Sequence, residues 1–240
     1  MIGFISSGFN PPSSLTLEEV SFMERSSKII VDTYTSSNYL REFRGRELVF
    51  AGRRDLEDFG RILSEEEDIS LVVPGDSFSA TTHFIIYKEC RKKGIPVKVF
   101  HNSSIFPAAA TALGLQLYKV GPPVSIPRFT DHFKPTSPYQ KIRENIERGL
   151  HTILLLDTEP PMTLNEALDE ISWMESSFPE KIFTGDREIG VVMALGTEKE
   201  RMVYGKISDV KALKPESPTA VVIPGALHFE EMEALDLFRI

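Results

Sequence analysis

Residues 69–83, ISLVVPGDSFSATTH, carry the clearest fold signal in the 240-residue chain. Ile69–Val73 is a short, mostly apolar run, which predicts a buried strand. Pro74-Gly75-Asp76 ends this run, and a helix is expected over Ser79–Lys93, closed by Gly94 and followed by Pro96. A buried strand, a polar loop and a helix in this order are the repeating unit of an α/β domain.

The same alternation extends on both sides of this stretch, through residues 1–114, which we expect to form the first domain. Strands are predicted at Ile2–Ile5, Lys28–Tyr34, Glu47–Ala51 and Val97–Phe100, and helices at Leu15–Ser27 (capped by Ser13 or Ser14), Asp55–Leu63 and Ser103–Ala112. Strands that alternate with helices predict a mainly parallel sheet covered by helices on its faces.

Residues 115–240 are expected to form a second α/β domain with a mixed or antiparallel sheet. Residues 121–138 contain five prolines and are predicted to link the two domains. Further helices are predicted at Tyr139–Arg148, Thr163–Met174 and Phe229–Leu237, and strands at Thr152–Leu156, Ile189–Leu195, Arg201–Ile207 and Ala220–Ile223. The strands at Ile189–Leu195 and Arg201–Ile207 are joined by a short polar turn, which predicts an antiparallel hairpin.

Bulk composition limits the functional classes. The net charge is -8, from 35 acidic and 27 basic residues, which argues against general nucleic-acid binding because that requires many cationic side chains. Cys90 is the only cysteine, so no internal disulfide can form and a reducing compartment is expected. No apolar run reaches membrane-spanning length and no signal peptide is recognisable, which favours a cytoplasmic protein without membrane contact.

Familiar catalytic and nucleotide-binding motifs are missing from the sequence. There is no GxxxxGKS/T phosphate loop, no GxGxxG after the first strand, no GxSxG and no HExxH. The five histidines lack ligand-like spacing, so no metal site is predicted.

The remaining candidates are loops at strand ends, where ligands bind in open α/β sheets. Asp76 could accept a hydrogen bond from a ligand, or Asp76 or Ser79 could simply cap the next helix. Ser103 and Ser104 are good helix caps as well, and His228, at the start of the last helix, is more often a capping or surface residue than a catalyst. The residues alone therefore indicate an α/β protein with ligand-binding loops.

Taken together, these loops resemble those of the diphthine synthases. Pro74-Gly75-Asp76 with Ala80-Thr81-Thr82-His83 is similar to the family segment PGDPLVATTH, residues 148–157 to RGLHTLLFLD, and residues 224–228 to VPGKLH. Weaker matches in the same order are residues 33–36 to EFYTS, 101–106 to HAPSIY, 114–119 to GLHIYKFG and 135–139 to PTSYYD. The PGD element is common to the wider tetrapyrrole methylase superfamily, whereas ATTH, GLHT and PGxLH are more specific.

The resemblance implies two α/β domains of the tetrapyrrole-methylase type, a homodimer, and S-adenosylmethionine bound in a cleft between the domains. It also implies a protein substrate, elongation factor 2, whose 3-amino-3-carboxypropyl-histidine is methylated on its amino group during diphthamide biosynthesis, with S-adenosylhomocysteine as product. The implied cofactor contacts are Phe9, Asp76, Ser79, Ser104, Ile105, Leu156, Leu195 and His228, several of them through backbone groups. No general base is identified, because bulk water can take the proton.

Two departures from the family pattern leave alternatives open. Ser6 and Ser7 replace a glycine and an apolar residue after the first strand, and Ala194 stands where an arginine is usual. A corrin-precursor methyltransferase is one alternative, disfavoured by the negative charge and the lack of a basic cluster. A non-catalytic module that binds S-adenosylmethionine or a translation factor is the other, and the departures are what make it plausible.

Overall fold

The structure is a computed structural model that describes residues 1–58, 67–179, 181–215 and 217–240. The chain divides into two compact units, Met1–Ser104 and Ile105–Ile240. Helix α4 (Ile105–Ala112) lies in the second unit. From the sequence we expected it in the first domain, residues 1–114. The physical reason is packing, because Ala109 and Ala110 are buried in a hydrophobic cluster with strands of the second unit.

The first unit is built on a five-stranded sheet in which every strand pairing is parallel. Its strands are β1 (Ile2–Ser6), β2 (Lys28–Asp32), β3 (Leu48–Ala51), β4 (Ile69–Val73) and β5 (Val97–Phe100), in the order β3-β2-β4-β1-β5. The prediction of a mainly parallel sheet is confirmed. All the carboxyl ends of these strands consequently lie along one edge of the sheet.

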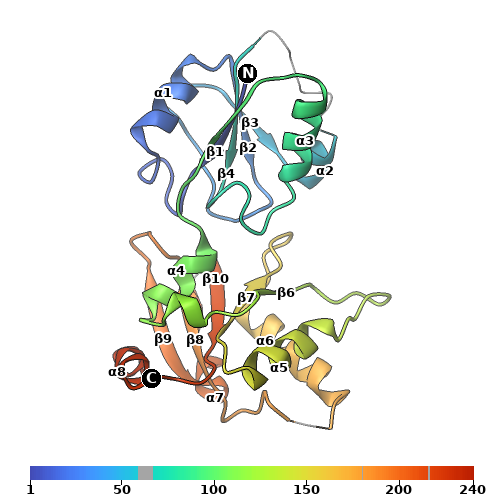
Figure 1. Ribbon diagram of the computed structural model, residues 1–240, viewed down its shortest axis with the longest axis vertical. Coiled ribbons are helices and arrows are strands. Elements are labelled where there is room, and N and C mark those ends of the chain that lie inside the picture. The colour runs from blue at the N-terminus through green and yellow to red at the C-terminus, as the bar shows by residue number, and fades with distance from the viewer. Residues whose placement is uncertain (59–66, 180, 216) are drawn as a thin grey trace. The chain divides into compact units, whose positions relative to one another are not determined.

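Helices cover both faces of this sheet (Figure 1). On one face, Phe22 and Met23 of α1 (Leu17–Arg25) pack with Ile5 and Val72 of the sheet. On the other face, Leu56 of α2 (Arg53–Glu57) and Cys90 of α3 (Phe84–Lys92) share a cluster with Phe4 of the sheet. Neighbouring strand residues thus enter opposite clusters, as the two-residue period of a strand requires.

Three helix predictions in this unit need correction. Helix α1 is capped by Thr16 and not by Ser13 or Ser14: the Thr16 side chain accepts from the Glu19 N–H at 3.2 Å, and Glu19 accepts from the Thr16 N–H at 2.7 Å. Helix α3 begins at Phe84 and not at Ser79, because Ala80 has a φ of 60°, which interrupts a right-handed helix. Helix α2 begins before the predicted Asp55, and residues 59–63 of that prediction lie outside the described residues.

The second unit contains a mixed five-stranded sheet. Its strands are β6 (Val124–Ile126), β7 (Thr152–Leu156), β8 (Glu188–Met193), β9 (Arg201–Lys206) and β10 (Thr219–Ile223), in the order β6-β7-β10-β8-β9. Only the β6–β7 pair is parallel, and β8–β9 is the predicted antiparallel hairpin. Strand β6 lies inside the proline-rich segment predicted as a linker; prolines flank it, which an edge strand tolerates.

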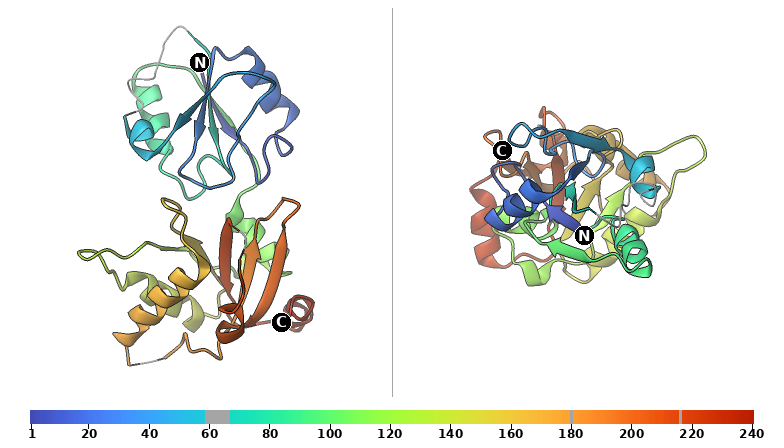
Figure 2. Two further views of the ribbon diagram at one scale, coloured as in Figure 1. Left: turned by 180° about the vertical axis from the view of Figure 1, so that it is seen from behind. Right: turned by 90° about the horizontal axis from the view of Figure 1, so that it is seen from above.

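Helices cover both faces of this sheet as well, as the views in Figures 1 and 2 agree. Helices α5 (Ser137–Glu147), α6 (Leu164–Ser176) and α7 (Ile207–Val210) share one hydrophobic cluster with the sheet. Helices α4 and α8 (Phe229–Asp236) share another, on the opposite face, and a 3-10 turn, η2, spans Leu117–Lys119. Within the described part of the chain, no helix has the length and apolar character needed to span a membrane.

Candidate functional site

The exits of β1 and β4 are joined backbone to backbone at the carboxyl edge of the first sheet. The Gly8 N–H donates to the Gly75 carbonyl at 3.1 Å, and the Gly75 N–H donates to the Gly8 carbonyl at 2.9 Å. Gly8 has a φ of +64°, and a Cβ there would lie 2.9 Å from the Cβ of Ser14. The turn after β1 therefore does depend on a glycine, located one residue beyond the two serines.

Those serines fasten the β1 exit to the PGD loop. Ser6 and Ser7 are fully buried. The Ser6 hydroxyl lies 2.9 Å from that of Ser77 and also accepts from the Ser77 N–H at 2.9 Å, and the Ser7 hydroxyl donates to the Val73 carbonyl at 3.1 Å. The departure from the family pattern at these two positions thus supplies hydrogen bonds between the two loops.

Asp76 organises the turn that follows β4. Its Oδ1 accepts from the Phe78 N–H at 3.1 Å, the Ser79 N–H at 3.1 Å and the Ser79 hydroxyl at 3.0 Å, while its Oδ2 lies 2.8 Å from His101 Nδ1. Burial raises the pKa of the Asp76 carboxyl, but hydrogen bonds from His101, Phe78 and Ser79 outweigh burial and lower that pKa below its usual value. Asp76 is therefore an ionised capping residue of the 77–79 turn, and its Oδ2 can accept one further hydrogen bond.

The other predicted residues of the first unit lie in the loops of the same edge. The Phe9 carbonyl accepts a hydrogen bond from the Asn38 side chain. Ser79 is exposed, and Ser104, close after β5, is buried. Phe9, Asp76, Ser79 and Ser104 therefore all follow strand ends at the edge where an open α/β sheet binds ligands.

Leu156 and Leu195 come together at one edge of the second sheet. Leu156 ends β7, and Leu195 lies two residues beyond the end of β8. Leu155 of β7 and Met193 of β8 pair with Ala220 and Thr219 at the start of β10. Ile105 and Leu195 pack against the same hydrophobic cluster. The start of β10 therefore lies at the same edge of the second sheet as Leu156 and Leu195.

Ala194, where the family has an arginine, makes a tight turn at this edge. It is 3% exposed and has a φ of 46°, which is unusual for a residue other than glycine. Its N–H donates to the Pro218 carbonyl at 2.8 Å, and its carbonyl accepts from the Thr197 N–H at 3.1 Å. Three described non-glycine residues have positive φ, and two of them, Ala80 and Ala194, lie in the candidate loops. Backbone strain of this kind gathers at functional sites.

His228 does not lie near Leu156 and Leu195. It follows the far end of β10, and the length of that strand, about 15 Å, separates it from Leu156 and Leu195. It is an exposed residue at the N-cap of α8, and its N–H donates to Glu231 Oε2 at 2.8 Å. Thr219, at the start of β10, lies at the edge instead. Antiparallel pairing of β10 with β7 and β8 is the signal that distinguishes the two residues, because it places the start of β10 beside the ends of its neighbours.

The RGLHT and PGALH segments bind one another. His151 and Glu231 are at most 1% exposed. His151 Nδ1 accepts from the Gly225 N–H at 3.0 Å, so the neutral ring carries its proton on Nε2 and donates to Glu231 Oε1 at 2.9 Å. Glu231 also accepts from the Gln116 N–H at 2.9 Å and from the Lys119 ammonium.

The environment sets the charges of this pair. Burial lowers the pKa of His151 and keeps the ring neutral. Burial raises the pKa of Glu231, but hydrogen bonds from His228, Lys119, Gln116 and His151 outweigh burial and lower that pKa to about 2. The two motifs that are more specific to the diphthine synthases thus hold the start of β7 and the end of β10 together.

Comparison with known proteins agrees with this architecture. Residues 1–211 match the family model described as Tetrapyrrole (Corrin/Porphyrin) Methylases. The diphthine synthase of Methanocaldococcus jannaschii is 36% identical, over 95% of each chain, and the diphthine methyl ester synthase of Bos taurus is 32% identical, over 100% of this chain and 95% of its own. The crystal structure of a putative diphthine synthase from Entamoeba histolytica superposes with a TM-score of 0.87 at 27% identity, covering 100% of this chain and 98% of its own. The chain belongs to the tetrapyrrole methylases and, within them, to the diphthine synthase family.

Proposed function

We propose that the protein is the methyltransferase that methylates the amino group of 3-amino-3-carboxypropyl-histidine on elongation factor 2, with S-adenosylmethionine as methyl donor. The observation that carries this proposal is the similarity to diphthine synthases through both units, over 95% or more of the chain. The corrin-precursor alternative draws no support from the charge of -8. Of the departures that motivated the non-catalytic alternative, Ser6 and Ser7 use their side chains to hydrogen-bond the candidate loops.

The residues of the first unit fit a cationic cofactor. When bound, S-adenosylmethionine supplies a methyl group already activated on a sulfonium. The ionised Asp76, with spare capacity on Oδ2, offers negative charge at the sheet edge, and the bridged Gly8 and Gly75 leave backbone without side chains beside it. These groups hold and orient, and orientation of two reactants alone can supply several kcal/mol of the barrier reduction.

The finer parts of the proposal follow the resemblance and the fold. Besides Asp76, the proposed cofactor contacts are Phe9, Ser79, Ser104, Ile105, Leu156 and Leu195, with Thr219 in place of His228. We propose a homodimer, as the resemblance implies, and a cytoplasmic location, in line with the single buried cysteine.

Replacing Asp76 with alanine should weaken S-adenosylmethionine binding by about 10-fold or more, because the proposed hydrogen bond from the cofactor to the ionised carboxylate, worth about 1.5–3 kcal/mol, is lost. Isothermal titration calorimetry on the full chain measures this change. Glu47→Ala removes an exposed carboxylate of the same unit and serves as the control. Unchanged affinity in Asp76→Ala would remove Asp76 from the cofactor site.

Mass spectrometry of the histidine peptide of elongation factor 2 tests the function directly. The factor carries the 3-amino-3-carboxypropyl group and is incubated with the protein and S-adenosylmethionine. We expect stepwise methyl additions that are absent when S-adenosylhomocysteine replaces the donor. An unmodified peptide, with factor and donor shown to be competent with another enzyme, contradicts the proposal.

The same experiment locates each methyl group. Some relatives are named diphthine synthase and others diphthine methyl ester synthase, so their names differ in whether a carboxylate is methylated. Mild alkaline treatment of the peptide hydrolyses a methyl ester and leaves N-methyl groups in place. The mass lost on this treatment therefore counts ester methyls, and the mass retained counts methyls on nitrogen.

A further inference from the structure

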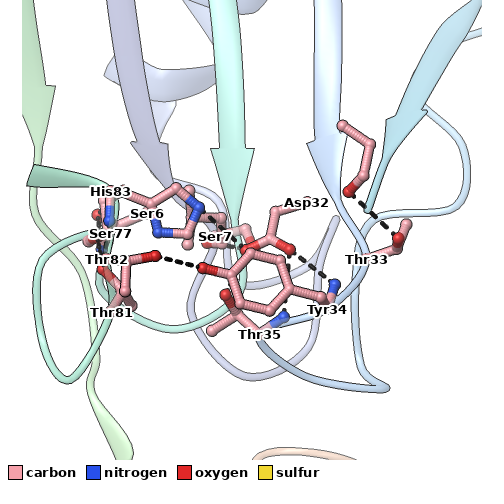
Figure 3. A network of polar contacts seen from close by, with 12 residues as sticks. Ser6, Ser7, Asp32, Thr33, Tyr34, Thr35, Ser77, Thr81, Thr82 and His83 are labelled. Carbon is pink, nitrogen blue, oxygen red and sulfur yellow. Dashed lines mark hydrogen bonds and ion pairs between the residues drawn. The ribbon is translucent and has the colours of Figure 1, made fainter. Parts of the chain in front are cut away.

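A second polar cluster lies at the carboxyl edge of the first sheet, at the exit of β2 (Figure 3). Asp32 is the last residue of β2, and His83 lies at the end of the loop that leads from β4 into α3. His83 Nε2 is 3.2 Å from Asp32 Oδ2, and the two side chains are 1% and 0% exposed. None of the candidate cofactor contacts belongs to this cluster.

The buried pair is tightly held on the Asp32 side and open on the His83 side. Asp32 Oδ1 accepts from the Tyr34 N–H at 2.7 Å and the Thr35 N–H at 3.1 Å, and Oδ2 accepts from the Thr35 hydroxyl. Neither ring nitrogen of His83 has a hydrogen-bond partner among the described residues. An acidic and a basic group in such a position stabilise a fold less than apolar side chains of the same size would. Stability alone therefore gives little reason for this pair.

The pair fixes the position of Tyr34. The Tyr34 ring stacks on the His83 ring, with centroids 5.8 Å apart and planes 20° apart. Its backbone is held by Asp32, and its hydroxyl lies 2.7 Å from the hydroxyl of Thr82. Tyr34 is partly exposed and Thr82 is exposed, whereas Asp32 and His83 lie beneath them. The result is a pair of hydroxyl groups in contact at the surface, with the buried side chains of Asp32 and His83 beneath them.

This hydroxyl pair suits a ligand that carries both an amine and a carboxylate. Each hydroxyl can accept a hydrogen bond from an N–H group and donate one to a carboxylate oxygen, without adding a formal charge. Thr82 is three residues beyond Ser79 in the loop that begins with Asp76. One loop therefore carries proposed donor contacts at its beginning and a hydroxyl of the second cluster at its end.

We propose that the Tyr34 and Thr82 hydroxyls form the subsite for the methyl acceptor, and that they bind the amine and carboxylate of its aminocarboxypropyl side chain. Asp32 and His83 are positioning residues that hold Tyr34 in place. This inference rests on the proposed function, since it takes the nature of the acceptor from it.

The test uses Tyr34→Phe and Thr82→Val in the full chain, with elongation factor 2 carrying the aminocarboxypropyl group as substrate. Tyr34→Phe keeps the ring on His83 and removes only the hydroxyl. Each variant should lower kcat/KM for the factor by about 10-fold, the effect of one lost hydrogen bond, while the Kd for S-adenosylmethionine stays unchanged. The double variant should lower kcat/KM more than either single variant, because each hydroxyl binds a different part of the acceptor. Tyr39→Phe, at another partly exposed tyrosine of this unit, is the matched control.

The positioning role is tested separately. His83→Phe keeps an aromatic ring under Tyr34 but removes the polar contact with Asp32. Asp32→Asn still accepts from the two N–H groups but no longer accepts from the Thr35 hydroxyl. Both should raise KM for the factor without changing cofactor affinity. Full kcat/KM in the two variants would reduce the pair to a structural role.

The outcomes separate the two proposals. If the wild type transfers methyl groups and both Tyr34→Phe and Thr82→Val do so equally well, the acceptor subsite is overturned while the proposed function stands. Loss of cofactor affinity in step with activity would also overturn it, by placing the hydroxyls at the donor site. A wild type that transfers nothing overturns the proposed function and the subsite with it.

Discussion

Replacing Glu231 with alanine should lower the free energy of unfolding of the second unit by about 3–5 kcal/mol, because several buried hydrogen bonds are lost together. The change leaves the His151 Nε2–H, the Gln116 N–H and the His228 N–H without their acceptor, and the Lys119 ammonium without its carboxylate. Buried donors that lose their acceptor pay the full cost of desolvation. The loss should therefore exceed that of any single surface ion pair.

The chain contains a convenient probe for this measurement. Trp173 is the only tryptophan and lies in α6 of the second unit, so its fluorescence during denaturant unfolding reports on that unit. Glu230→Ala removes the neighbouring exposed carboxylate and should change the stability by less than about 0.5 kcal/mol. A Glu231→Ala variant that unfolds at the same denaturant concentration as Glu230→Ala would contradict the network described for these residues.

Replacing Gly225 with alanine should cost about 3 kcal/mol, at the upper end of what overpacking costs. A Cβ at this position would lie 2.5 Å from the Gly149 carbonyl oxygen and 2.5 Å from backbone atoms of Leu150. Because these are backbone atoms, no side-chain rotation relieves the contact. The 149–151 and 224–226 segments must move apart, which also breaks the bond from the Gly225 N–H to His151.

Gly185→Ala is the matched control for this prediction, because a Cβ there would have no neighbour within 4 Å. It should leave the stability unchanged or raise it by up to about 1 kcal/mol, through the lower entropy of the unfolded chain. Trp173 fluorescence again reports the midpoint. Equal stability of the Gly225→Ala and Gly185→Ala variants would show that the two segments are not in close contact.

The fold was largely predictable from the sequence because its strands are short, apolar and bounded by glycine and proline. The run at residues 69–76 indicated both the strand and its polar exit loop. Strand β6 was not predicted because it has only three residues and lies between prolines. It forms a strand through its pairing with β7, which the local sequence does not reveal. The cap of α1 was misplaced because Ser13, Ser14 and Thr16 are chemically alike, and only geometry selects among them.

The candidate site was less predictable, because residues that contact one another there are far apart in the sequence. His83 is 51 residues from Asp32 and Glu231 is 80 residues from His151, and no local period reveals such pairs. His228 was grouped with Leu156 and Leu195 only through the resemblance to the diphthine synthases. The sequence does not state that β10 runs against β7 and β8, and strand direction decides which end of β10 joins them.

The place of β1 between β4 and β5 has a consequence for the order of events during synthesis. Ile2 pairs with Ile69 on one side and with Val97 on the other. Both edges of β1 therefore stay unpaired until these later residues have been synthesised. At ordinary translation speeds, about 5–20 s pass between the emergence of β1 and that of β5. During this interval an apolar strand lacks at least one of its neighbours, and a nascent chain in this state is a natural client for chaperones.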